Sequence, residues 1–368
     1  MCGRCGAAPS AGFASLRRVD PLRSVLVVRL SALGDVLFAL PAVRALLASG
    51  RAERVSWLVE DRAAGLLAGI PGLADVVIFP RRRASRWPGH FLRLAARRDD
   101  LVLDLQGNLK SRLQLAFLRA PRKVGFNPVL AREGSHRAFT EQVAPPPWAQ
   151  HRVAQSLALV AALGVPVARR PPRPPLPIDE AARARVGLAL AALPDDATQG
   201  GGRRAPLVVL HPGTSAFGEF KRWSPERFAA TGLALARQDG ARVLVTGGPG
   251  EEALVAAVRA AAPGTLHAAP RGGLPDLLAL LAAADLVIAS DSLPLHLANF
   301  LGTPVVGLYG PKDPAATGPF FDRSAVVRAG VACSPCTLRR CGDRICMEWL
   351  AVEPVLAAAR GLLAEGRP

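Results

Sequence analysis

Val25-Leu-Val-Val-Arg29-Leu-Ser-Ala-Leu-Gly34-Asp35-Val-Leu-Phe-Ala-Leu-Pro41 joins an apolar, β-branched run to a helical pattern through a short turn. The run predicts a buried parallel strand, and the spacing of the apolar residues from Val36 onward predicts a helix. Asp35 then lies at the N-cap or in the first turn of that helix. Capping alone, worth about 1 kcal/mol, is the simpler role for such a residue. A functional role is the alternative, because open α/β sheets bind ligands at the carboxyl ends of their strands.

The same alternation of strand and helix continues along the chain. Apolar runs predict strands over 25–28, 55–59, 76–79, 101–105 and 123–126, and again over 207–210, 243–246, 286–289 and 305–308. Helical patterns between them include 61–68, a segment ending at Arg97, 179–193, 277–283 and 352–364, and Ser224-Pro225 is a typical helix start. This order predicts an α/β protein with doubly wound parallel sheets.

A Pro-rich segment separates the two series of strands. Residues 169–177 read Arg-Arg-Pro-Pro-Arg-Pro-Pro-Leu-Pro, and residues 195–204 are rich in Gly and polar side chains. We therefore expect a flexible N-terminal extension (1–20), a first α/β domain (21–170), a Pro/Gly-rich linker region (171–205), a second α/β domain (206–351) and a C-terminal helix (352–368). Two such domains would face a central cleft in which a ligand binds.

The composition describes a basic chain with a large apolar share. The net charge is +17, only four lysines are present, and 50% of the residues are hydrophobic. No apolar run of about 18 residues predicts a transmembrane helix, and residues 1–20 lack the apolar segment of a signal peptide. The charge favours anionic partners. A nucleic-acid-binding protein is the weaker alternative, because no DNA- or RNA-binding motif accompanies the charge.

Several side chains that suit a diphosphate follow the strands of the second domain. Gly213-Thr214-Ser215 offers backbone N–H groups and hydroxyls, Ser292 opens the helix that carries His296, and Lys221 follows the Thr214 turn. Each alone has a simpler explanation, as a packed histidine or a solvated lysine. No strand-linked G-x-G-x-x-G, Walker A or D-x-D motif is present, so Lys221, hydroxyls and a helix N-terminus would have to stabilise a diphosphate.

Motifs across most of the chain resemble glycosyltransferase family 9, the bacterial ADP-heptose:lipopolysaccharide heptosyltransferases. They are Arg29-Leu-Ser-Ala-Leu-Gly-Asp35, Asp104-Leu-Gln-Gly107 with Lys110-Ser111, His211-Pro-Gly-Thr214 with Lys221-x-Trp223, Ser290-Asp291-Ser292 with His296, and Tyr309-Gly310-Pro311-x-Asp313-Pro314. Three further segments resemble heptosyltransferase I in particular: Arg81-Arg-Arg83 to Arg86-Trp87, Lys110-Ser111 and Ala131-Arg132-Glu133.

The resemblance implies a GT-B fold, in which two Rossmann-like domains face a central cleft. The acceptor would bind to the first domain and the nucleotide-sugar to the second. It also implies inverting transfer of heptose from ADP-heptose to Kdo of the lipopolysaccharide inner core, with no metal or other cofactor. Asp35 would be the general base that takes the proton of the acceptor hydroxyl.

The resemblance assigns two further groups of residues. Thr214, Ser215 and Lys221 would hold the ADP phosphates, and Asp291, Ser292 and His296 would line the same pocket. Glu251 is a candidate for the ribose, although Glu252 fits almost as well. The anionic Kdo–lipid A acceptor would be bound by Arg81, Arg82, Arg83, Lys110 and Arg132, and a solvated basic loop is the alternative for the arginine run.

Two features depart from the family pattern. Leu293 stands where the family usually has Gly, and a side chain there would crowd the phosphates or alter the turn. The segment Cys333, Cys336, Cys341 and Cys346 resembles a Cys-rich tail of many family members, though less that of heptosyltransferase I. It offers four thiols for a structural zinc, but the loose spacing favours reduced or redox-labile thiols. A family member with another donor or acceptor, such as a heptosyltransferase II-like enzyme, and a catalytically inactive member therefore stay open as alternatives.

The resemblance also implies where the protein works. We expect a cytoplasmic enzyme with peripheral contact at the inner face of the inner membrane, where its lipid acceptor lies. We expect no nucleic-acid partner. The sequence leaves the oligomeric state open.

Overall fold

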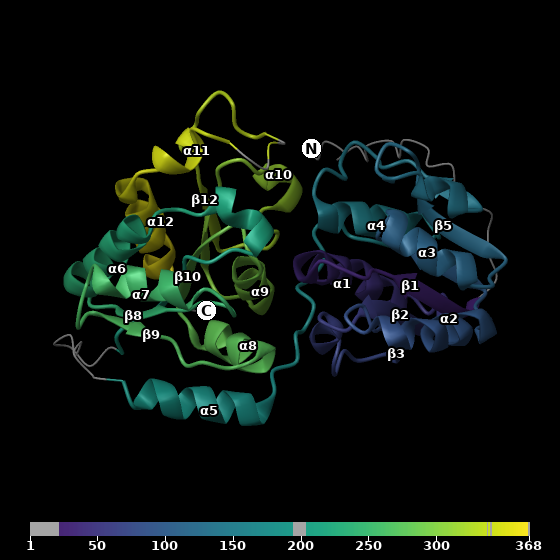
Figure 1. Cartoon of the computed structure of the whole chain (residues 1–368), viewed down its shortest axis with the longest axis horizontal. Helices are drawn as coiled ribbons and strands as arrows, with labels where there is room; N and C mark the ends of the chain where they lie inside the picture. Colours follow the sequence, from purple (N-terminus) through teal and green to yellow (C-terminus); the bar gives the residue numbers. More distant parts are fainter. Residues whose placement is uncertain (1–21, 194–203, 337, 339–340, 367–368) are drawn as a thin grey trace, which may run out of the picture.

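The computed structural model describes residues 22–193, 204–336, 338 and 341–366. Two parallel sheets of six strands each form the centres of two lobes (Figure 1). The α/β class and the two doubly wound sheets predicted from the sequence are confirmed. The predicted extension 1–20, with Cys2 and Cys5, lies outside the described residues. No helix in the described ranges is long and apolar enough to cross a membrane.

The first lobe alternates strands and helices. Its strands are β1 (Leu22–Val28), β2 (Ala52–Glu60), β3 (Leu73–Phe79), β4 (Leu101–Asp104), β5 (Arg122–Phe126) and β6 (Glu141–Val143). Its helices are α1 (Leu33–Ala48), α2 (Trp87–Ala96), α3 (Leu109–Phe117) and α4 (Arg152–Ala162), with short 3-10 helices η1 (Ala64–Leu66), η2 (Ala84–Arg86) and η3 (Ser135–Ala138).

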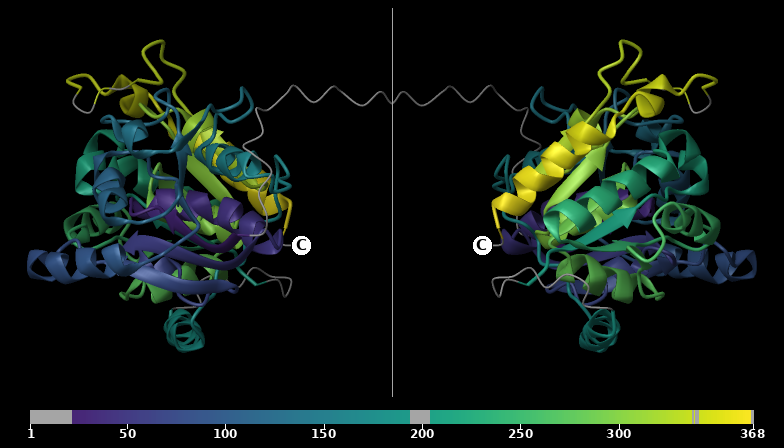
Figure 2. Two further views of the ribbon diagram at one scale, coloured as in Figure 1. Left: turned by 90° about the vertical axis from the view of Figure 1, so that its right-hand side faces the viewer. Right: turned by 90° about the vertical axis from the view of Figure 1, so that its left-hand side faces the viewer.

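The second lobe repeats this plan. Its strands are β7 (Leu207–His211), β8 (Arg242–Val245), β9 (Leu266–Ala268), β10 (Leu286–Ser290), β11 (Val305–Leu308) and β12 (Ser324–Val327). Its helices are α6 (Pro225–Asp239), α7 (Glu252–Ala260), α8 (Leu274–Ala283), α9 (Leu293–Leu301), α10 (Pro314–Thr317), α11 (Ile345–Glu348) and α12 (Val352–Ala364), and η4 (Ala216–Lys221) follows β7. Helix α5 (Glu180–Ala191) lies between the lobes in sequence, and α12 packs beside α6 (Figure 2).

Both sheets have the same strand order. The first runs β3-β2-β1-β4-β5-β6, and the second runs β12-β11-β10-β7-β8-β9. Each is the Rossmann order 3-2-1-4-5-6, in which the direction of winding reverses between the first and fourth strands. Ligands bind at this reversal, outside the carboxyl ends of the strands. The structure therefore points to the ends of β1 and β4 in one lobe and of β7 and β10 in the other.

The alternation of side chains along β1 explains how the first sheet is covered on both faces. Val25 and Val27 face a core that includes α1, whereas Leu26 and Val28 face a second core under α2 and α3. The first of these cores continues into the second lobe, where it includes Leu297 and Phe300 of α9. Because α1 and α9 contact one another, the two lobes share one apolar core (Figure 1).

The structure differs from the sequence predictions mainly at short elements. The helix predicted over 61–68 is wrong: the chain forms turns and only the 3-10 helix η1 there, and Gly65 is an unfavourable residue inside the predicted helix. Strands β6, β9 and β12 were not predicted. They have three or four residues each and lie at the sheet edges. Their sequences are therefore too short and too little buried to show the apolar run of a central strand.

Candidate active site

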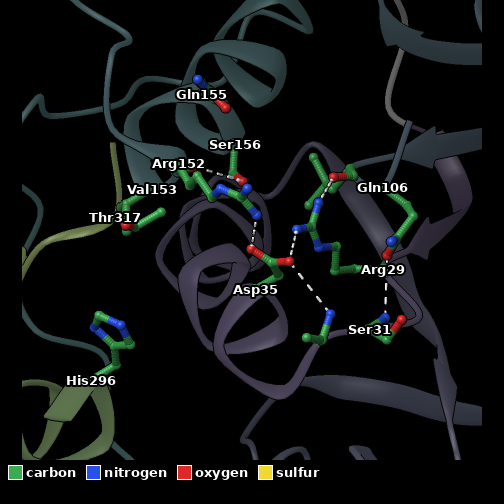
Figure 3. A network of polar contacts seen from close by, with 12 residues as sticks. Arg29, Ser31, Asp35, Gln106, Arg152, Val153, Gln155, Ser156, His296 and Thr317 are labelled. Atoms are coloured by element: carbon green, nitrogen blue, oxygen red, sulfur yellow. Dashed lines mark hydrogen bonds and ion pairs between the residues drawn. The ribbon is translucent and has the colours of Figure 1, made fainter. Parts of the chain in front are cut away.

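Asp35 is the third residue of α1 and lies at the reversal point of the first sheet (Figure 3). Its Oδ2 atom accepts a 3.4 Å hydrogen bond from the backbone N–H of Ala32, which is the capping contact expected of a first-turn aspartate. Two arginines also bind it. Arg29 Nη2 lies 3.0 Å from Oδ2, and Arg152 Nη1 donates to Oδ1. A helix cap requires neither arginine, so contacts from outside the helix also fix the position of the Asp35 carboxylate.

The two arginines decide the charge of Asp35. Burial by itself raises the pKa of this carboxyl, but the Arg29 and Arg152 guanidinium groups outweigh burial and hold the pKa below its ordinary value. The carboxylate is therefore ionised at neutral pH. Arg152 was not predicted as a site residue. It is the first residue of α4 and stands 117 positions after Asp35, so no local pattern connects the two.

Gln106 fixes the turn between β1 and α1. Its side-chain oxygen accepts hydrogen bonds from the backbone N–H groups of Leu30, at 3.0 Å, and Ser31, at 3.2 Å. Gln106 directly follows Leu105 at the end of β4, which is the other strand of the reversal point. The position of Asp35 thus depends on both strands.

Lys221, Asp291 and His296 form one polar cluster in the second lobe. Lys221 Nζ lies 2.7 Å from the carbonyl oxygen of Asp291 and 2.9 Å from its Oδ2. His296 Nε2 lies 3.2 Å from Asp291 Oδ1, and the Tyr309 hydroxyl lies 3.5 Å from the same oxygen. Burial raises the pKa of Asp291, but His296 and Lys221 outweigh burial and hold it far below its usual range. The structure therefore brings together three of the residues predicted to bind the donor.

Buried polar atoms around this cluster have no partner in the described part of the chain. They are His211 Nδ1, Ser290 Oγ, Ser292 Oγ and His296 Nδ1. Buried polar groups are nearly always hydrogen-bonded, so these four atoms, on β7, β10, α9 and the turn before α9, are available to bind water or a ligand. Burial lowers the pKa of His211 to about 4, which keeps its ring neutral at physiological pH.

Thr214 and Ser215 follow β7 in the loop that leads to Lys221. Thr214 is buried, and Arg222 Nε donates a 3.2 Å hydrogen bond to its hydroxyl while Nη2 binds its carbonyl oxygen at the same distance. Ser215 is exposed at the start of η4. Arg222 was not predicted, although its place beside Lys221 was a usable signal. It adds a second cation to the loop.

The structure distinguishes Glu251 from Glu252, the two candidates for binding the ribose. Glu251 Oε2 accepts a 2.7 Å hydrogen bond from the backbone N–H of Gly248 and lies 3.9 Å from His211 Nε2. Its carboxylate also occupies the space that a side chain at position 213 would need, which explains why Gly213 is required. Glu252 is exposed. Of the two candidates, only Glu251 therefore faces the cluster.

Leu293 begins α9 and does not distort the turn before it. Ser292, the N-cap, is extended with a φ of −149° and a ψ of 165°. Leu293 has no positive φ, and its side chain packs partly buried against the shared core. The backbone here consequently does not need the glycine that the family usually has.

The helices that carry the two groups of residues, α1 and α9, are in contact across the interface of the lobes. A Cβ atom placed on Gly34, the neighbour of Asp35, would lie 3.9 Å from His296 Cδ2. Figure 3 shows His296 on the second lobe and Asp35 with its arginines on the first. The sequence predicted that the strand ends of the two domains face one another, and the structure brings α1 and α9, which follow β1 and β10, into contact.

The five predicted acceptor-binding residues lie along the first lobe. Lys110 Nζ is 2.9 Å from Ser31 Oγ and 3.0 Å from Glu60 Oε1, and Arg81 Nε is 3.9 Å from the same Glu60 oxygen. Arg82, Arg83 and Arg132 are exposed and, within the described ranges, have no carboxylate partner. Two of the five residues therefore converge on Glu60, a buried residue that sequence reasoning missed.

The four C-terminal cysteines are free thiols. The backbone N–H of Cys336 binds the carbonyl oxygen of Pro311 at 2.8 Å, and burial together with the neighbouring thiols raises the pKa of Cys346. Across the residues that the structure describes, no group of three or more His, Cys, Asp or Glu side chains is arranged to hold a metal ion.

Known structures share this architecture. A glycosyltransferase family 9 structure from Veillonella parvula superimposes with a TM-score of 0.78 and 21% identity, covering 96% of this chain and 100% of that one. The heptosyltransferase WaaC of E. coli, solved with ADP, has a TM-score of 0.67 and 24% identity, over 92% of this chain and 99% of that one. These likenesses confirm the GT-B arrangement predicted from the sequence.

Sequence comparisons identify the family. The lipopolysaccharide core heptosyltransferase OpsX of Haemophilus influenzae is 27% identical over 83% of this chain and 84% of its own length. Lipopolysaccharide heptosyltransferase 1 of Pseudomonas aeruginosa is 28% identical over 86% and 87%. Residues 89–344 match the sequence profile of glycosyltransferase family 9 (heptosyltransferase). With two Rossmann-type lobes and a match to the family profile over more than half of its length, the chain belongs to glycosyltransferase family 9 and is a glycosyltransferase.

Proposed function

We propose that this enzyme transfers heptose from ADP-heptose to Kdo of the lipopolysaccharide inner core. The observation that supports the proposal is the contact between α1 and α9, because α1 carries an ionised carboxylate and α9 carries His296 of a cluster suited to a diphosphate. Relatives along most of the chain are lipopolysaccharide heptosyltransferases. One of the similar structures holds ADP and another holds ADP-2-deoxy-2-fluoro heptose, both in WaaC of E. coli.

Asp35 acts as the general base in this proposal. Within the described residues, Oδ1 accepts a hydrogen bond only from Arg152, and a carboxylate oxygen has two lone pairs. Oδ1 therefore keeps a position for the acceptor hydroxyl. The hydroxyl oxygen attacks the anomeric carbon as its proton passes to Asp35, and the bond from that carbon to the phosphate oxygen of ADP breaks. A single displacement of this kind inverts the anomeric centre.

The second lobe stabilises the leaving ADP. Lys221, Thr214, Ser215 and the N-terminus of α9 at Ser292 surround the position of the phosphates and offset the negative charge that develops there. Asp291 orients Lys221 and His296 through the contacts described above. Glu251 binds the ribose hydroxyls. These groups supply the stabilisation without a metal ion.

The first lobe binds the acceptor. Arg81, Arg82, Arg83, Lys110 and Arg132 pair with the Kdo carboxylates and lipid A phosphates. We place the domain limits at residues 170 and 206, with acceptor binding in 21–170 and donor binding in 206–351. Because the acceptor is a membrane lipid, we propose a cytoplasmic enzyme with peripheral contact at the inner membrane.

Transfer assays with the full chain test this function. Wild-type protein, ADP-heptose and Kdo–lipid A are incubated with a metal chelator, and the anomeric configuration of the product is determined by NMR. Asp35→Asn, which keeps the size of the side chain, is expected to lose about a hundredfold or more in kcat and to bind ADP normally. Near-wild-type turnover of Asp35→Asn would exclude Asp35 as the base.

The same assay separates the alternatives. A heptosyltransferase II-like enzyme, which relatives over about a third of the chain suggest, would use an acceptor that already carries heptose and leave Kdo–lipid A unmodified. An inactive family member would fail to bind ADP in calorimetry. Either result would replace the proposed reaction while leaving the fold and family unchanged.

A further inference from the structure

Large apolar side chains are exposed on the outer face of α2 and α3. Leu92 of α2 is 72% exposed, and Leu109, Leu113 and Phe117 of α3 are 56%, 42% and 39% exposed. The three residues of α3 are four positions apart, so they form one stripe along the helix. Single exposed apolar residues are ordinary, whereas three in one stripe indicate a contact surface, and α2, which packs against α3, adds the exposed Leu92.

The packing of the two helices explains why these side chains face outward. His90 of α2 and Gln114 of α3 are hydrogen-bonded at 2.8 Å, and both are buried against the sheet. The rings of Phe91 and Phe117 stack with their centroids 4.3 Å apart. With these faces used for packing, Leu92 and Leu113 lie on the sides turned away from the core. Both helices lie on the part of the first lobe remote from the second lobe (Figure 1).

Cationic residues are concentrated in the two segments that contain α2 and α3, and several of them have no carboxylate partner among the described residues. Residues 80–98 contain seven arginines and no Asp or Glu, and residues 109–120 add Lys110, Arg112 and Arg119, again without an acidic residue. Among the described residues, Arg82, Arg86 and Arg93 have no carboxylate partner. The surface therefore combines exposed leucines with uncompensated positive charge.

This combination fits the surface of an anionic bilayer. Apolar side chains enter the boundary between headgroups and acyl chains, and guanidinium groups pair with lipid phosphates. A second copy of this chain would bring like charges together, which opposes self-association through the same face. We propose that the α2–α3 surface, formed by Leu92, Leu109, Leu113 and Phe117 with Arg86 and Arg93, docks the enzyme on anionic phospholipid. This inference rests on the proposed function, since a lipid acceptor gives the enzyme a reason to reach the bilayer.

Helix α3 connects this surface to the acceptor side of the active site. Leu109 and Lys110 are its first two residues. Leu109 is on the exposed stripe, whereas Lys110 reaches Ser31 and Glu60 beside the β1–α1 turn. If Leu109 contacts the bilayer, the next residue, Lys110, lies between the bilayer and the β1–α1 turn. Lys110 can therefore bind the headgroup of a lipid acceptor as it enters the active site.

Vesicle co-sedimentation of the full chain, without donor or acceptor, tests the docking surface. Vesicles contain either phosphatidylethanolamine with phosphatidylglycerol or phosphatidylcholine alone. We expect binding only to the anionic vesicles, weakened by added salt. The double variant Leu92→Ser/Leu113→Ser should bind them about tenfold more weakly, because it removes two apolar side chains from the contact. Leu188→Ser is the matched control, since Leu188 is 74% exposed on α5, outside this surface.

Three results would overturn the inference. They are unchanged vesicle binding by the double variant, equal binding to both kinds of vesicle, and a dimer in analytical ultracentrifugation that the double variant abolishes. Transfer to acceptor dispersed in detergent is measured in parallel and should be unchanged in the double variant. Failure of vesicle binding with intact transfer would reject the docking surface alone, and intact vesicle binding without transfer would reject the proposed function alone.

Discussion

The ring of Phe38 lies edge-to-face against the ring of His296, with the centroids 4.8 Å apart. Phe38 is buried one helical turn after Asp35, and His296 binds Asp291 in the other lobe. The Phe38 ring also contacts His151 at 5.2 Å and Phe300 at 6.2 Å. One aromatic cluster thus joins the helix that carries the proposed base to the helix that carries part of the proposed donor site.

Phe38→Ala should uncouple the two helices. Removing a buried phenylalanine costs about 3–5 kcal/mol of stability, so the variant is assayed at a temperature where it is folded. We expect kcat to fall at least tenfold while ADP affinity from calorimetry stays near wild type, because the donor residues belong to the second lobe. Phe38→Leu should recover part of the loss.

Phe228→Ala is the matched control for this variant. Phe228 is fully buried on α6 and packs against Trp223, away from α1. It should lose comparable stability and keep its kcat when folded. An equal fall of kcat in both variants would show that Phe38 contributes only to stability.

Arg152→Gln should change the pH dependence of transfer. Arg152 lowers the pKa of Asp35, so its removal raises that pKa and moves the acidic limb of the kcat/KM profile to higher pH. Arg183→Gln, an exposed change on α5, serves as control. An acidic limb at the same pH in Arg152→Gln and wild type would mean that the limb does not report Asp35.

Lys221→Ala should weaken ADP binding by about tenfold or more, as expected for the loss of a charged hydrogen-bond donor to phosphate. Calorimetry with ADP measures the change. Arg237→Ala removes an exposed charge from α6 in the same lobe and should leave affinity unchanged. Wild-type affinity in Lys221→Ala would reject its assignment to the phosphates.

Asp104→Asn should remove one component of the pH dependence of stability. Burial raises the pKa of Asp104 from 3.8 to about 6, so the folded chain holds a proton that the unfolded chain releases. The Asp104 contribution to the free energy of unfolding is therefore complete below about pH 4 and is lost as the pH rises through about 6.

Urea denaturation from pH 4 to pH 8 measures this component. Asn keeps the Oδ1 atom that accepts from the backbone N–H groups of Gln106 and Gly107, at 2.7 and 3.1 Å. In the variant, the free energy of unfolding should no longer show the Asp104-dependent decrease between about pH 4 and pH 6. Asp322→Asn, at an exposed position, should retain it. The same decline in Asp104→Asn and wild type would contradict a proton held by Asp104.

The amino-acid sequence by itself determined the main strands and the first-turn position of Asp35. Buried parallel strands leave continuous apolar runs, and a polar residue between such a run and a helical pattern has few other places to lie. The gathering of Lys221, Asp291 and His296 also followed from the sequence, because parallel strands bring their carboxyl ends to one edge. The prediction of a helix over 61–68 was wrong, since a short apolar pattern that contains Gly65 does not by itself specify a helix.

Only the tertiary structure decided which residues meet across long separations. Arg152 binds Asp35 although 117 positions separate them, and Phe38 meets His296 only because α1 packs against α9 of the other lobe. The outward stripe of α3 also depends on how that helix packs against α2. These contacts arise when whole helices, strands and lobes pack together. The periodicity of a short segment does not show which surface its helix or strand will pack against.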